Sequence, residues 1–464
     1  MDNEFLKYVS TRGHQEKLEF HDVIFEGLAP DGGLYIPEDW PTLKQSTIAS
    51  FSDKSYLDIA YDVLLPFLDN TISVDDLRLI IKSAYKSFDT EEITPITKIN
   101  EKEYLLELHH GPTYAFKDIA MQFIAQLMNY YLSKDNLTIN ILGATSGDTG
   151  AAAIEGFSNI KSINIFILHP HKKITDIQRK FMTTVSSENV FNIAIEGNFD
   201  DCQKIIKSIF ADNEFKKSKK LTAVNSINWA RIMCQIVYYF YSASRLPRGK
   251  DIIFSVPTGN FGDIFAGFIS SKMGLKIKDL IIATNENDIL MRTLNDGEHK
   301  LKEVITTSSP SIDIQISSNF ERLIYDITKN PNYIKKLMEE LNKKKSYTLS
   351  REIINEIKKS FKAYSISQNE VKSIISSLYS DKNILIDPHT AVGLAASRKN
   401  KSNNCIHVTL STAHPAKFKE TVSSITKDEK FIPQKVKELF NLDEKLVVLK
   451  NDTELVKKFI MENI

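Results

Sequence analysis

The sequence predicts an α/β protein whose sheet is mostly parallel. From about residue 96, short apolar runs rich in β-branched residues alternate with segments of helical periodicity. Two glycine-rich turns also lie where such a run passes into a helix. Strands that alternate with helices are connected by crossovers, and crossovers join parallel strands.

The composition is that of an ordinary globular protein and excludes several partners. Lys plus Arg and Asp plus Glu both number 59 in 464 residues, so the formal net charge is zero. No basic excess is available to hold nucleic acid or an anionic membrane. The acidic start lacks a signal-peptide core, and no apolar run reaches about 18 residues. We expect a cytoplasmic enzyme that binds neither nucleic acid nor a membrane.

The cysteines and one histidine pair give no metal or disulfide signal. His169 and His171 have no acidic or cysteine partner at ligand spacing. The cysteines are odd in number and far apart, which is typical of a reducing compartment; they are Cys202, Cys234 and Cys405. We expect no metal site.

The first 95 residues are predicted to form a separate N-terminal domain. Residues 31–37, Asp-Gly-Gly-Leu-Tyr-Ile-Pro, indicate a turn followed by a short strand. Helical patterns follow over residues 56–67 and 74–87.

The alternating part of the chain contains six predicted strands. Each is a short apolar run bounded by polar or glycine-rich residues; they cover 104–108, 137–142, 163–168, 191–195, 252–256 and 280–284. Residues 330–382 differ, because they are rich in Lys, Glu and Ser with helical periodicity over 333–345 and 351–364. We interpret 330–382 as a solvated helical insertion whose charges lie at the surface.

Lys117 is the first candidate for catalysis. It ends the run His-Gly-Pro-Thr-Tyr-Ala-Phe-Lys, where Gly111 and Pro112 form a turn before an apolar helical segment. A lysine at such a junction can be kept from bulk water with its amine fixed in direction, as an aldehyde cofactor requires. An exposed lysine at a helix start is the alternative.

The first glycine-rich turn, residues 143–150, follows the strand 137–142 and opens a helix. Its sequence is Gly-Ala-Thr-Ser-Gly-Asp-Thr-Gly. Backbone N–H groups and hydroxyls at a helix N-terminus favour a carboxylate or phosphate. A simple helix cap by Asp148 or Thr149 is the alternative, but eight small or polar residues in a row exceed what a cap requires.

The second glycine-rich turn, residues 257–263, lies between the strand 252–256 and another helix. Its sequence is Pro-Thr-Gly-Asn-Phe-Gly-Asp. Two glycines let the backbone approach a phosphate closely, and the helix dipole favours the charge. No Gly-Lys-Ser/Thr follows and the glycine spacing is not that of a dinucleotide site, so a nucleotide is not implied.

Two further segments carry polar side chains at short spacing. Residues 225–231 supply amides, a hydroxyl and the guanidinium of Arg231, which can bind a phosphate or form a surface salt bridge on a capped helix. Residues 411–418 follow the strand-like residues 407–410, and strand ends are where open α/β sheets place ligands.

Four residues beside these motifs keep open roles. His109, His110 and His414 flank the motifs and could line a pocket, whereas Lys417 could meet an anion or a helix end.

The motifs resemble, in the same order, those of the threonine synthase family. Residues 110–118 are similar to its lysine motif, and the resemblance also covers 144–150, 225–231, 256–263, 411–418 and the N-terminal 31–37. It extends over essentially the whole chain, in the longer branch shared by bacteria and fungi.

The resemblance implies a tryptophan-synthase-β-like fold of type II, with two open, mostly parallel sheets flanked by helices, an N-terminal segment and the helical insertion. It implies a large domain of residues 96–130 and 226–464 that binds pyridoxal 5′-phosphate, and a small α/β domain of residues 131–225.

The resemblance also implies a role for each motif residue. Lys117 would carry the cofactor as a Schiff base, Asp148 would face the 3′-oxygen of its ring where related enzymes have asparagine, and Thr412 would face the ring nitrogen. The cofactor phosphate would lie against Gly259, Asn260, Phe261, Gly262 and Asp263. The substrate would be bound by Thr145, Ser146, Gly147, Thr149, Asn225, Ser226 and Arg231.

The activity implied is that of a carbon–oxygen lyase: O-phospho-L-homoserine and water would give L-threonine and phosphate by γ-elimination and β-replacement, the last step of threonine biosynthesis. Two alternatives stay open, a phospho-amino-acid lyase that releases an oxo acid and a non-catalytic relative that only binds. We expect a monomer or homodimer.

Overall fold

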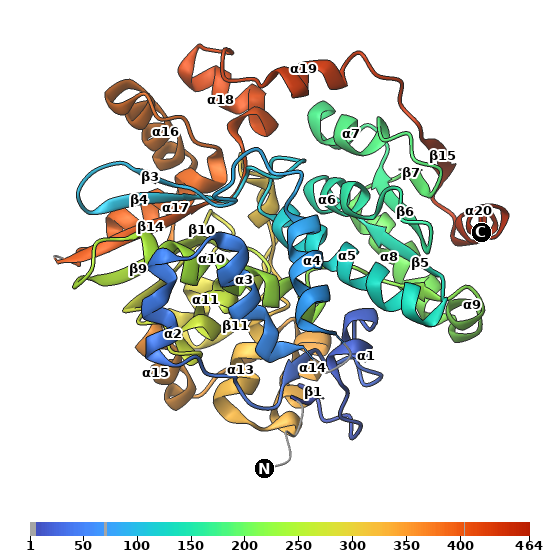
Figure 1. Cartoon of the computed structure of the whole chain (residues 1–464), viewed down its shortest axis with the longest axis horizontal. Coiled ribbons are helices and arrows are strands. Elements are labelled where there is room, and N and C mark those ends of the chain that lie inside the picture. Colours follow the sequence, from blue (N-terminus) through green and yellow to red (C-terminus); the bar gives the residue numbers. More distant parts are fainter. Residues whose placement is uncertain (1–5, 69–71, 403) are drawn as a thin grey trace.

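The computed structural model describes residues 6–68, 72–402 and 404–464, and its larger sheet has six strands (Figure 1). Five are parallel, and the edge strand β3 runs antiparallel to β4. In spatial order the strands are β13 (Phe361–Ser365), β10 (Asp279–Thr284), β9 (Asp251–Pro257), β14 (Cys405–Ser411), β4 (Glu103–Glu107) and β3 (Ile96–Lys98).

The smaller sheet has five strands, all parallel, and lies beside the first (Figure 1). Their order is β15 (Val447–Lys450), β7 (Val190–Glu196), β6 (Ile163–Pro170), β5 (Ile139–Ala144) and β8 (Leu221–Thr222). All six strands expected from apolar runs are present, so that prediction is confirmed. Continuous apolar runs form such strands because helices cover a parallel sheet on both faces.

Helices flank both sheets, and the strand–helix alternation in the sequence corresponds to these crossovers. The helices after residue 96 are α5 (Lys117–Asp135), α6 (Asp148–Phe157), α7 (Asp176–Thr183), α8 (Phe199–Ala211), α9 (Asn213–Ser218), α10 (Trp229–Arg245), α11 (Gly262–Lys272), α12 (Ile289–Asp296), α13 (Phe320–Thr328), α14 (Pro331–Lys344), α15 (Arg351–Ser360), α16 (Gln368–Lys382), α17 (Pro388–Lys399), α18 (Lys419–Thr426), α19 (Gln434–Leu439) and α20 (Thr453–Glu462).

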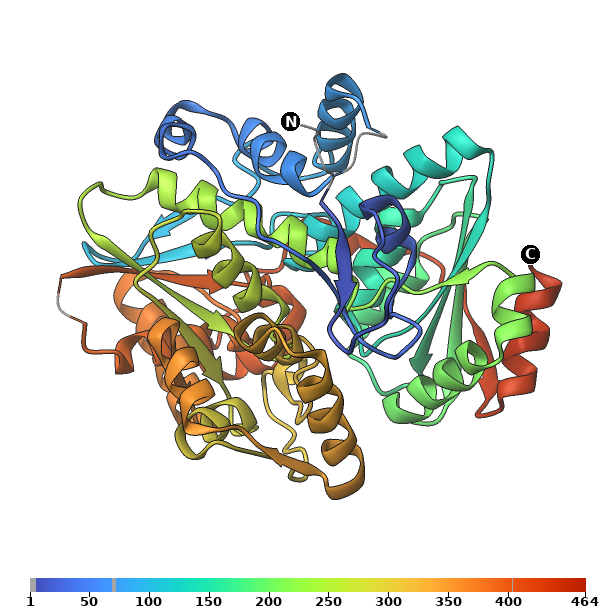
Figure 2. The same ribbon diagram turned by 90° about the horizontal axis from the view of Figure 1, so that it is seen from below.

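The N-terminal segment packs across the first sheet's helices rather than extending either sheet (Figure 2). It contains an antiparallel pair, β1 (Tyr8–Ser10) with β2 (Tyr35–Pro37), and its helix α3 packs on α10 while α4 packs on α5. The turn and strand predicted over 31–37 are confirmed by β2. The segment's helices are α1 (Phe20–Phe25), α2 (Gln45–Ser50), α3 (Tyr56–Leu64) and α4 (Val74–Ala84).

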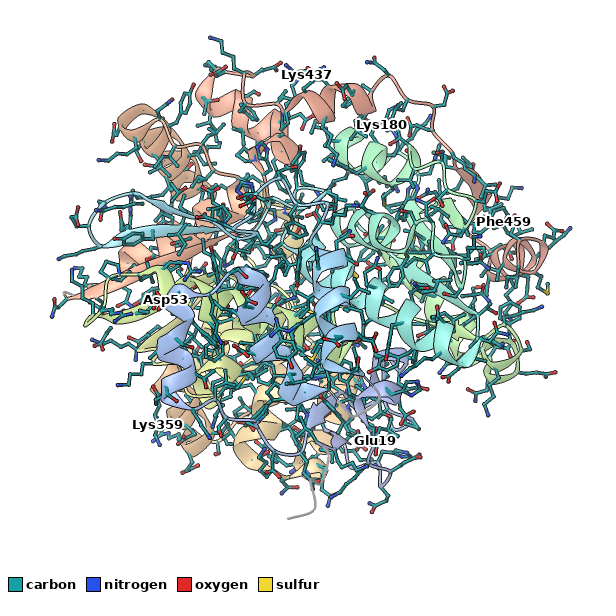
Figure 3. The ribbon with its side chains drawn as sticks, in the orientation of Figure 1. Glu19, Asp53, Lys180, Lys359, Lys437 and Phe459 are labelled. Atoms are coloured by element: carbon teal, nitrogen blue, oxygen red, sulfur yellow. The ribbon has the colours of Figure 1, made fainter. Side chains whose placement is uncertain are left out.

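The segment 330–382 is not purely helical. The helix predicted over 351–364 ends at Ser360, and Phe361–Ser365 forms β13, which pairs with β10 at the edge of the larger sheet. Residues Ser346–Thr348 (β12) also pair with Glu298–Lys300 (β11). Its charged helices do lie outside, as Figure 3 shows for Lys359. The helical pattern of apolar residues extends through 364, but pairing with β10 makes the last residues of that stretch a strand.

The C-terminal end of the chain joins the smaller sheet. β15 pairs with β7, and α20 packs on α8 (Figure 1). The domain boundaries stay a prediction, with this change: residues from about 447 lie with the small-domain strands and not with the rest of 226–464.

Candidate active site

Lys117 is the first residue of α5, and the turn before it is held by its neighbour Asp118. Thr113 donates to Asp118 twice, from its backbone N–H at 2.8 Å and from its hydroxyl at 2.6 Å. A Cβ on Gly111 would lie 2.4 Å from the Cβ of Asp118, so this close approach requires glycine. The turn therefore sets where the Lys117 side chain leaves the backbone.

The lysine turn is bonded to the turn that follows β14. The N–H of Phe116 donates to the carbonyl of Thr412 at 2.9 Å, and the N–H of His414 donates to the carbonyl of Tyr114 at 3.0 Å. These bonds place Thr412 and Lys117 on the wall of one pocket.

Asp148 lies at the centre of a buried charge cluster. Its carboxylate is 2.8 Å from the Nζ of Lys417 and 3.3 Å from the Nζ of Lys117, and it accepts a 2.9 Å hydrogen bond from Gln178. Lys417 is fully buried and donates also to the carbonyl of Thr113 at 2.8 Å. Lys417 therefore meets an anion, and Gln178 is a site residue that no sequence motif marks.

The cluster sets the protonation of both partners. Burial alone would raise the pKa of Asp148, but the charges of Lys417 and Lys117 bring it well below its usual value. Burial lowers the pKa of Lys117; Asp148 opposes this shift, while Lys417 and Arg231 add to it. The arrangement keeps an ionised carboxylate beside an amine that loses its proton more easily than a free lysine, which favours nucleophilic use.

Arg231 is buried in the wall of the same pocket, and no described acidic residue forms a salt bridge with it. Its Nε and Nη1 atoms lack a hydrogen-bond partner among the described residues, and burial lowers its pKa to about 10. The alternative of a surface salt bridge is therefore wrong. Two buried guanidinium nitrogens that the described residues leave unsatisfied are costly, which indicates that an anionic ligand completes the site.

The second glycine-rich turn brings backbone to the pocket. A Cβ on Gly259 would lie 2.9 Å from the carbonyl oxygen of Ser311, and Phe261 has a φ of 65°, in the left-handed region. Ser317 and Asn319 donate to the carbonyls of Gly259 and Asn260, at 2.7 and 3.0 Å. Both carbonyls are thus bonded to side chains outside the turn. The first N–H groups of a helix have no partner within the helix, so those of α11 are available to a ligand.

Asp263 at the start of α11 turns toward α10. One of its oxygens accepts from Tyr238 at 2.5 Å and from Tyr239 at 3.1 Å. Burial raises its pKa to about 7, although both tyrosines oppose the shift. Its side chain is thus bound to helix α10 in addition to lining the pocket.

The pocket brings together most of the predicted site. The predicted residues that line it are Lys117, Thr149, Ser226, Arg231, Gly259, Asn260, Phe261, Gly262, Asp263 and Thr412. Residues that the sequence did not mark also line it, among them Gln235, Ser311 and His389. His389 is structural, because its Nδ1 bonds Asp387 and its Nε2 accepts from the N–H of Ser311.

Five predicted residues are not among those that line the pocket in the described part of the chain: Thr145, Ser146, Gly147, Asp148 and Asn225. Of these, Asp148 is bound to Lys117, which does line it. The Thr145 hydroxyl accepts from the N–H groups of Gly147 and Gly150, so it holds the turn itself. Gly147 has a φ of 140°, and a Cβ there would lie 2.5 Å from the Gln178 side chain. Asn225 is exposed, and its side chain accepts from the N–H of Ile227.

Within the described residues, the helices α5, α6, α10 and α11 all begin at this pocket, with Lys117, Thr149, Arg231 and Gly262 in their first turns. Helix N-termini carry partial positive charge and free N–H groups. The site therefore suits a ligand with more than one anionic group, held next to a reactive amine.

Comparison with known protein families gives three consecutive matches. The family described as "Threonine synthase N terminus" matches residues 7–85, "Pyridoxal-phosphate dependent enzyme" matches 88–405, and "Threonine synthase, C-terminal" matches 390–460.

Whole proteins show the same similarity. The threonine synthase of Pseudomonas aeruginosa is 42% identical over 99% of this chain and 98% of its own, and that of Saccharomyces cerevisiae is 40% identical over 100% and 99%. Among solved structures, the pyridoxal-phosphate-bound threonine synthase from Brucella melitensis has a TM-score of 0.96 at 42% identity, covering 99% of both chains. The yeast threonine synthase structure has a TM-score of 0.93 at 40% identity, covering 99% and 98%.

Proposed function

Because the chain belongs to the threonine synthase family of pyridoxal-phosphate-dependent enzymes, we propose that it converts O-phospho-L-homoserine and water to L-threonine and phosphate. The observation that supports this substrate is Arg231, which lines the same pocket as Lys117 and whose buried Nε and Nη1 have no hydrogen-bond partner in the described ranges. A phosphorylated amino acid supplies the anion that Arg231 lacks.

The residues present fit pyridoxal phosphate, the cofactor of the family. The free N–H groups of α11 and the close backbone at Gly259 suit its phosphate, and Lys117 suits its aldehyde. When bound, the cofactor supplies an electron-withdrawing ring that stabilises negative charge on the carbon next to the substrate amine. Asp148 would face the 3′-oxygen of that ring as an ionised acceptor, and the Thr412 hydroxyl would face the ring nitrogen without enforcing its protonation.

Lys117 is proposed to carry the protons of the reaction. Its lowered pKa lets the free amine take a proton from the substrate Cα; once it has passed that proton on, it can take the Cβ proton and later return a proton to Cγ. Its place at the start of α5 keeps Nζ in the same pocket throughout. Asp148 and Lys417 hold the charge around Nζ constant, because both are buried and bonded to each other.

Arg231 is proposed to bind the substrate phosphate as it leaves. The N-terminus of α6 at Thr149 and the Ser226 side chain complete this second anion site. Neutralising the developing charge on the leaving group lowers the barrier to its departure. A proton then returns to Cγ, water adds at Cβ and a proton returns to Cα, which gives threonine. Thr145, Ser146, Gly147 and Asn225 would support this site through the turns that they form.

The test is to mix the cofactor-loaded protein with O-phospho-L-homoserine and measure free phosphate and the amino-acid product. Phosphate with equal threonine supports the proposal, whereas phosphate with an oxo acid would make the protein a phospho-amino-acid lyase. No phosphate from protein that retains cofactor absorbance would leave a binding protein.

Lys117→Ala is expected to abolish turnover and the absorbance of bound cofactor. Lys435→Ala is the matched control, because Lys435 donates to the carbonyl of Pro112 in the same turn from outside the pocket.

None of the helices in the described ranges is long and apolar enough to cross a membrane. We propose a cytoplasmic protein that acts on a small-molecule substrate, as a monomer or homodimer.

A further inference from the structure

A second cluster of ligand-type side chains lies at the end of β4, just before the turn that leads to Lys117. Glu107, His109 and His110 each place one ligand atom so that the three atoms lie within 4.8 Å of one another. We propose that these residues form a site for a divalent transition-metal ion such as Zn²⁺ or Co²⁺, separate from the pocket of the cofactor.

The donor set favours this class of ion. Two imidazole nitrogens and one carboxylate oxygen are typical of zinc sites that keep a fourth position for water, whereas Mg²⁺ and Ca²⁺ prefer oxygen ligands alone. The His109 and His110 rings are stacked, with centroids 4.9 Å apart and planes 28° from parallel, so one ring must turn for both to bind the same ion in their planes.

One buried ring nitrogen of these residues is unsatisfied in the part of the chain that the structure describes. The Nδ1 atom of His109 is buried and lacks a hydrogen-bond partner among the described residues. An orphaned buried nitrogen of this kind calls for an ion or a water.

The remaining ligands are oriented by a second layer. Thr97 donates to one oxygen of Glu107 at 2.5 Å, and the other oxygen is 2.7 Å from the Nε2 of His110. A metal ion would replace the hydrogen bond between Glu107 and His110, and the His110 ring would carry its proton on Nδ1. His414 packs edge-on against His109 at 5.5 Å and limits that ring's rotation.

The cluster is accessible to solvent and lies directly before the turn that leads to Lys117. The side chains of His110 and Glu107 are 25% and 21% exposed, so the cluster opens to solvent while His109 forms its floor. Residues 107–110 run directly into the Gly111–Pro112 turn, and Leu108 is bonded to Ser411 at 2.9 Å. An ion bound here would hold the lysine turn and the 411–417 turn in place, and would raise the Tm of the protein.

The experiment titrates chelator-treated, cofactor-loaded protein with Co²⁺ and follows its visible d–d absorbance, with stoichiometry from equilibrium dialysis. We expect one ion per chain, and we expect His109→Phe and Glu107→Gln each to weaken binding by about 10-fold or more. His14→Phe is the matched control, because His14 stands 3.7 Å from Glu16 away from the cluster, and it should bind Co²⁺ as the parent does.

Two results would overturn the site. Equal Co²⁺ affinity in the parent, His109→Phe and Glu107→Gln would place the ion elsewhere, and a signal that disappears only with the cofactor would place it on the cofactor. Retained cofactor absorbance shows that each variant is folded. The activity test of the preceding section is independent of this outcome.

Discussion

Lys417 and Asp148, 269 residues apart in the chain, form a buried ion pair with 2.8 Å between Nζ and the carboxylate. Lys417 is fully buried and Asp148 is 5% exposed. The same carboxylate is 3.3 Å from the Nζ of Lys117, so the charge next to the Lys117 amine depends on a residue contributed by the turn after β14.

Replacing Lys417 should lower the stability of the protein, and a second substitution at Asp148 should restore part of it. Lys417→Met leaves Asp148 with a weaker set of partners and should lower the free energy of unfolding by about 3 kcal/mol or more. Adding Asp148→Asn removes the unpaired charge and should restore part of that loss. Urea unfolding of the two variants measures both effects, and equal losses in the single and double variants would show that unpaired charge is not the cause.

Replacing Arg231 should weaken phosphate binding more than it affects the fold. Arg231→Met removes a guanidinium whose Nε and Nη1 are unpartnered among the residues that the structure describes, so the apo protein should keep or gain stability. The KM for O-phospho-L-homoserine should rise at least about 10-fold, since charged hydrogen bonds contribute about 1.5–3 kcal/mol each. Steady-state kinetics and inhibition by inorganic phosphate give the measurement, with Gln235→Met as a control in the same pocket wall. Unchanged KM would refute the substrate-site assignment.

The close backbone at Gly259 predicts a loss of cofactor affinity. In Gly259→Ala the new Cβ would meet the Ser311 carbonyl at 2.9 Å, so the turn must shift where the phosphate is proposed to bind. We expect the Kd of pyridoxal phosphate to rise. Gly27→Ala is the control, because its Cβ would have only ordinary contacts at 3.8 Å. Fluorescence titration of both apo proteins with pyridoxal phosphate measures the two Kd values. An equal rise in Gly27→Ala would mean that the close backbone at Gly259 is not responsible.

Asp263 should make stability fall as the pH rises. Its pKa is raised to about 7 in the folded protein from an ordinary value of 3.8, so the folded state binds the extra proton. That contribution is complete below pH 3.8 and is lost as the pH rises through 7. Asp263→Asn keeps an acceptor for Tyr238 and does not titrate.

From pH 5 to pH 7 the free energy of unfolding of Asp263→Asn should therefore rise relative to that of the parent by up to about 2 kcal/mol. Urea unfolding of both apo proteins at the two pH values gives this difference directly. The contribution of the histidines to the pH dependence is the same in both proteins and cancels. A constant difference across the two pH values would mean that Asp263 is ionised throughout.

Sequence alone determined the features that are written in short stretches of chain. The strands before both glycine-rich turns, the helix beginning at Lys117 and the ordered motifs of the family each depend on neighbours within a few residues, and local pattern is enough to recognise them. The alternation of strand and helix likewise determined that the sheets are mostly parallel.

Only the tertiary structure decided which charges meet. Lys417 could face an anion or a helix end until the β14 turn was seen bonded to the lysine turn, and Arg231 could be a surface residue until its helix was seen to be buried. β13 became a strand because β10 offered it an edge, although its own pattern continued a helix. The physical reason is common to all three: burial and partnership are properties of chain segments that are far apart in sequence, and packing brings those segments together.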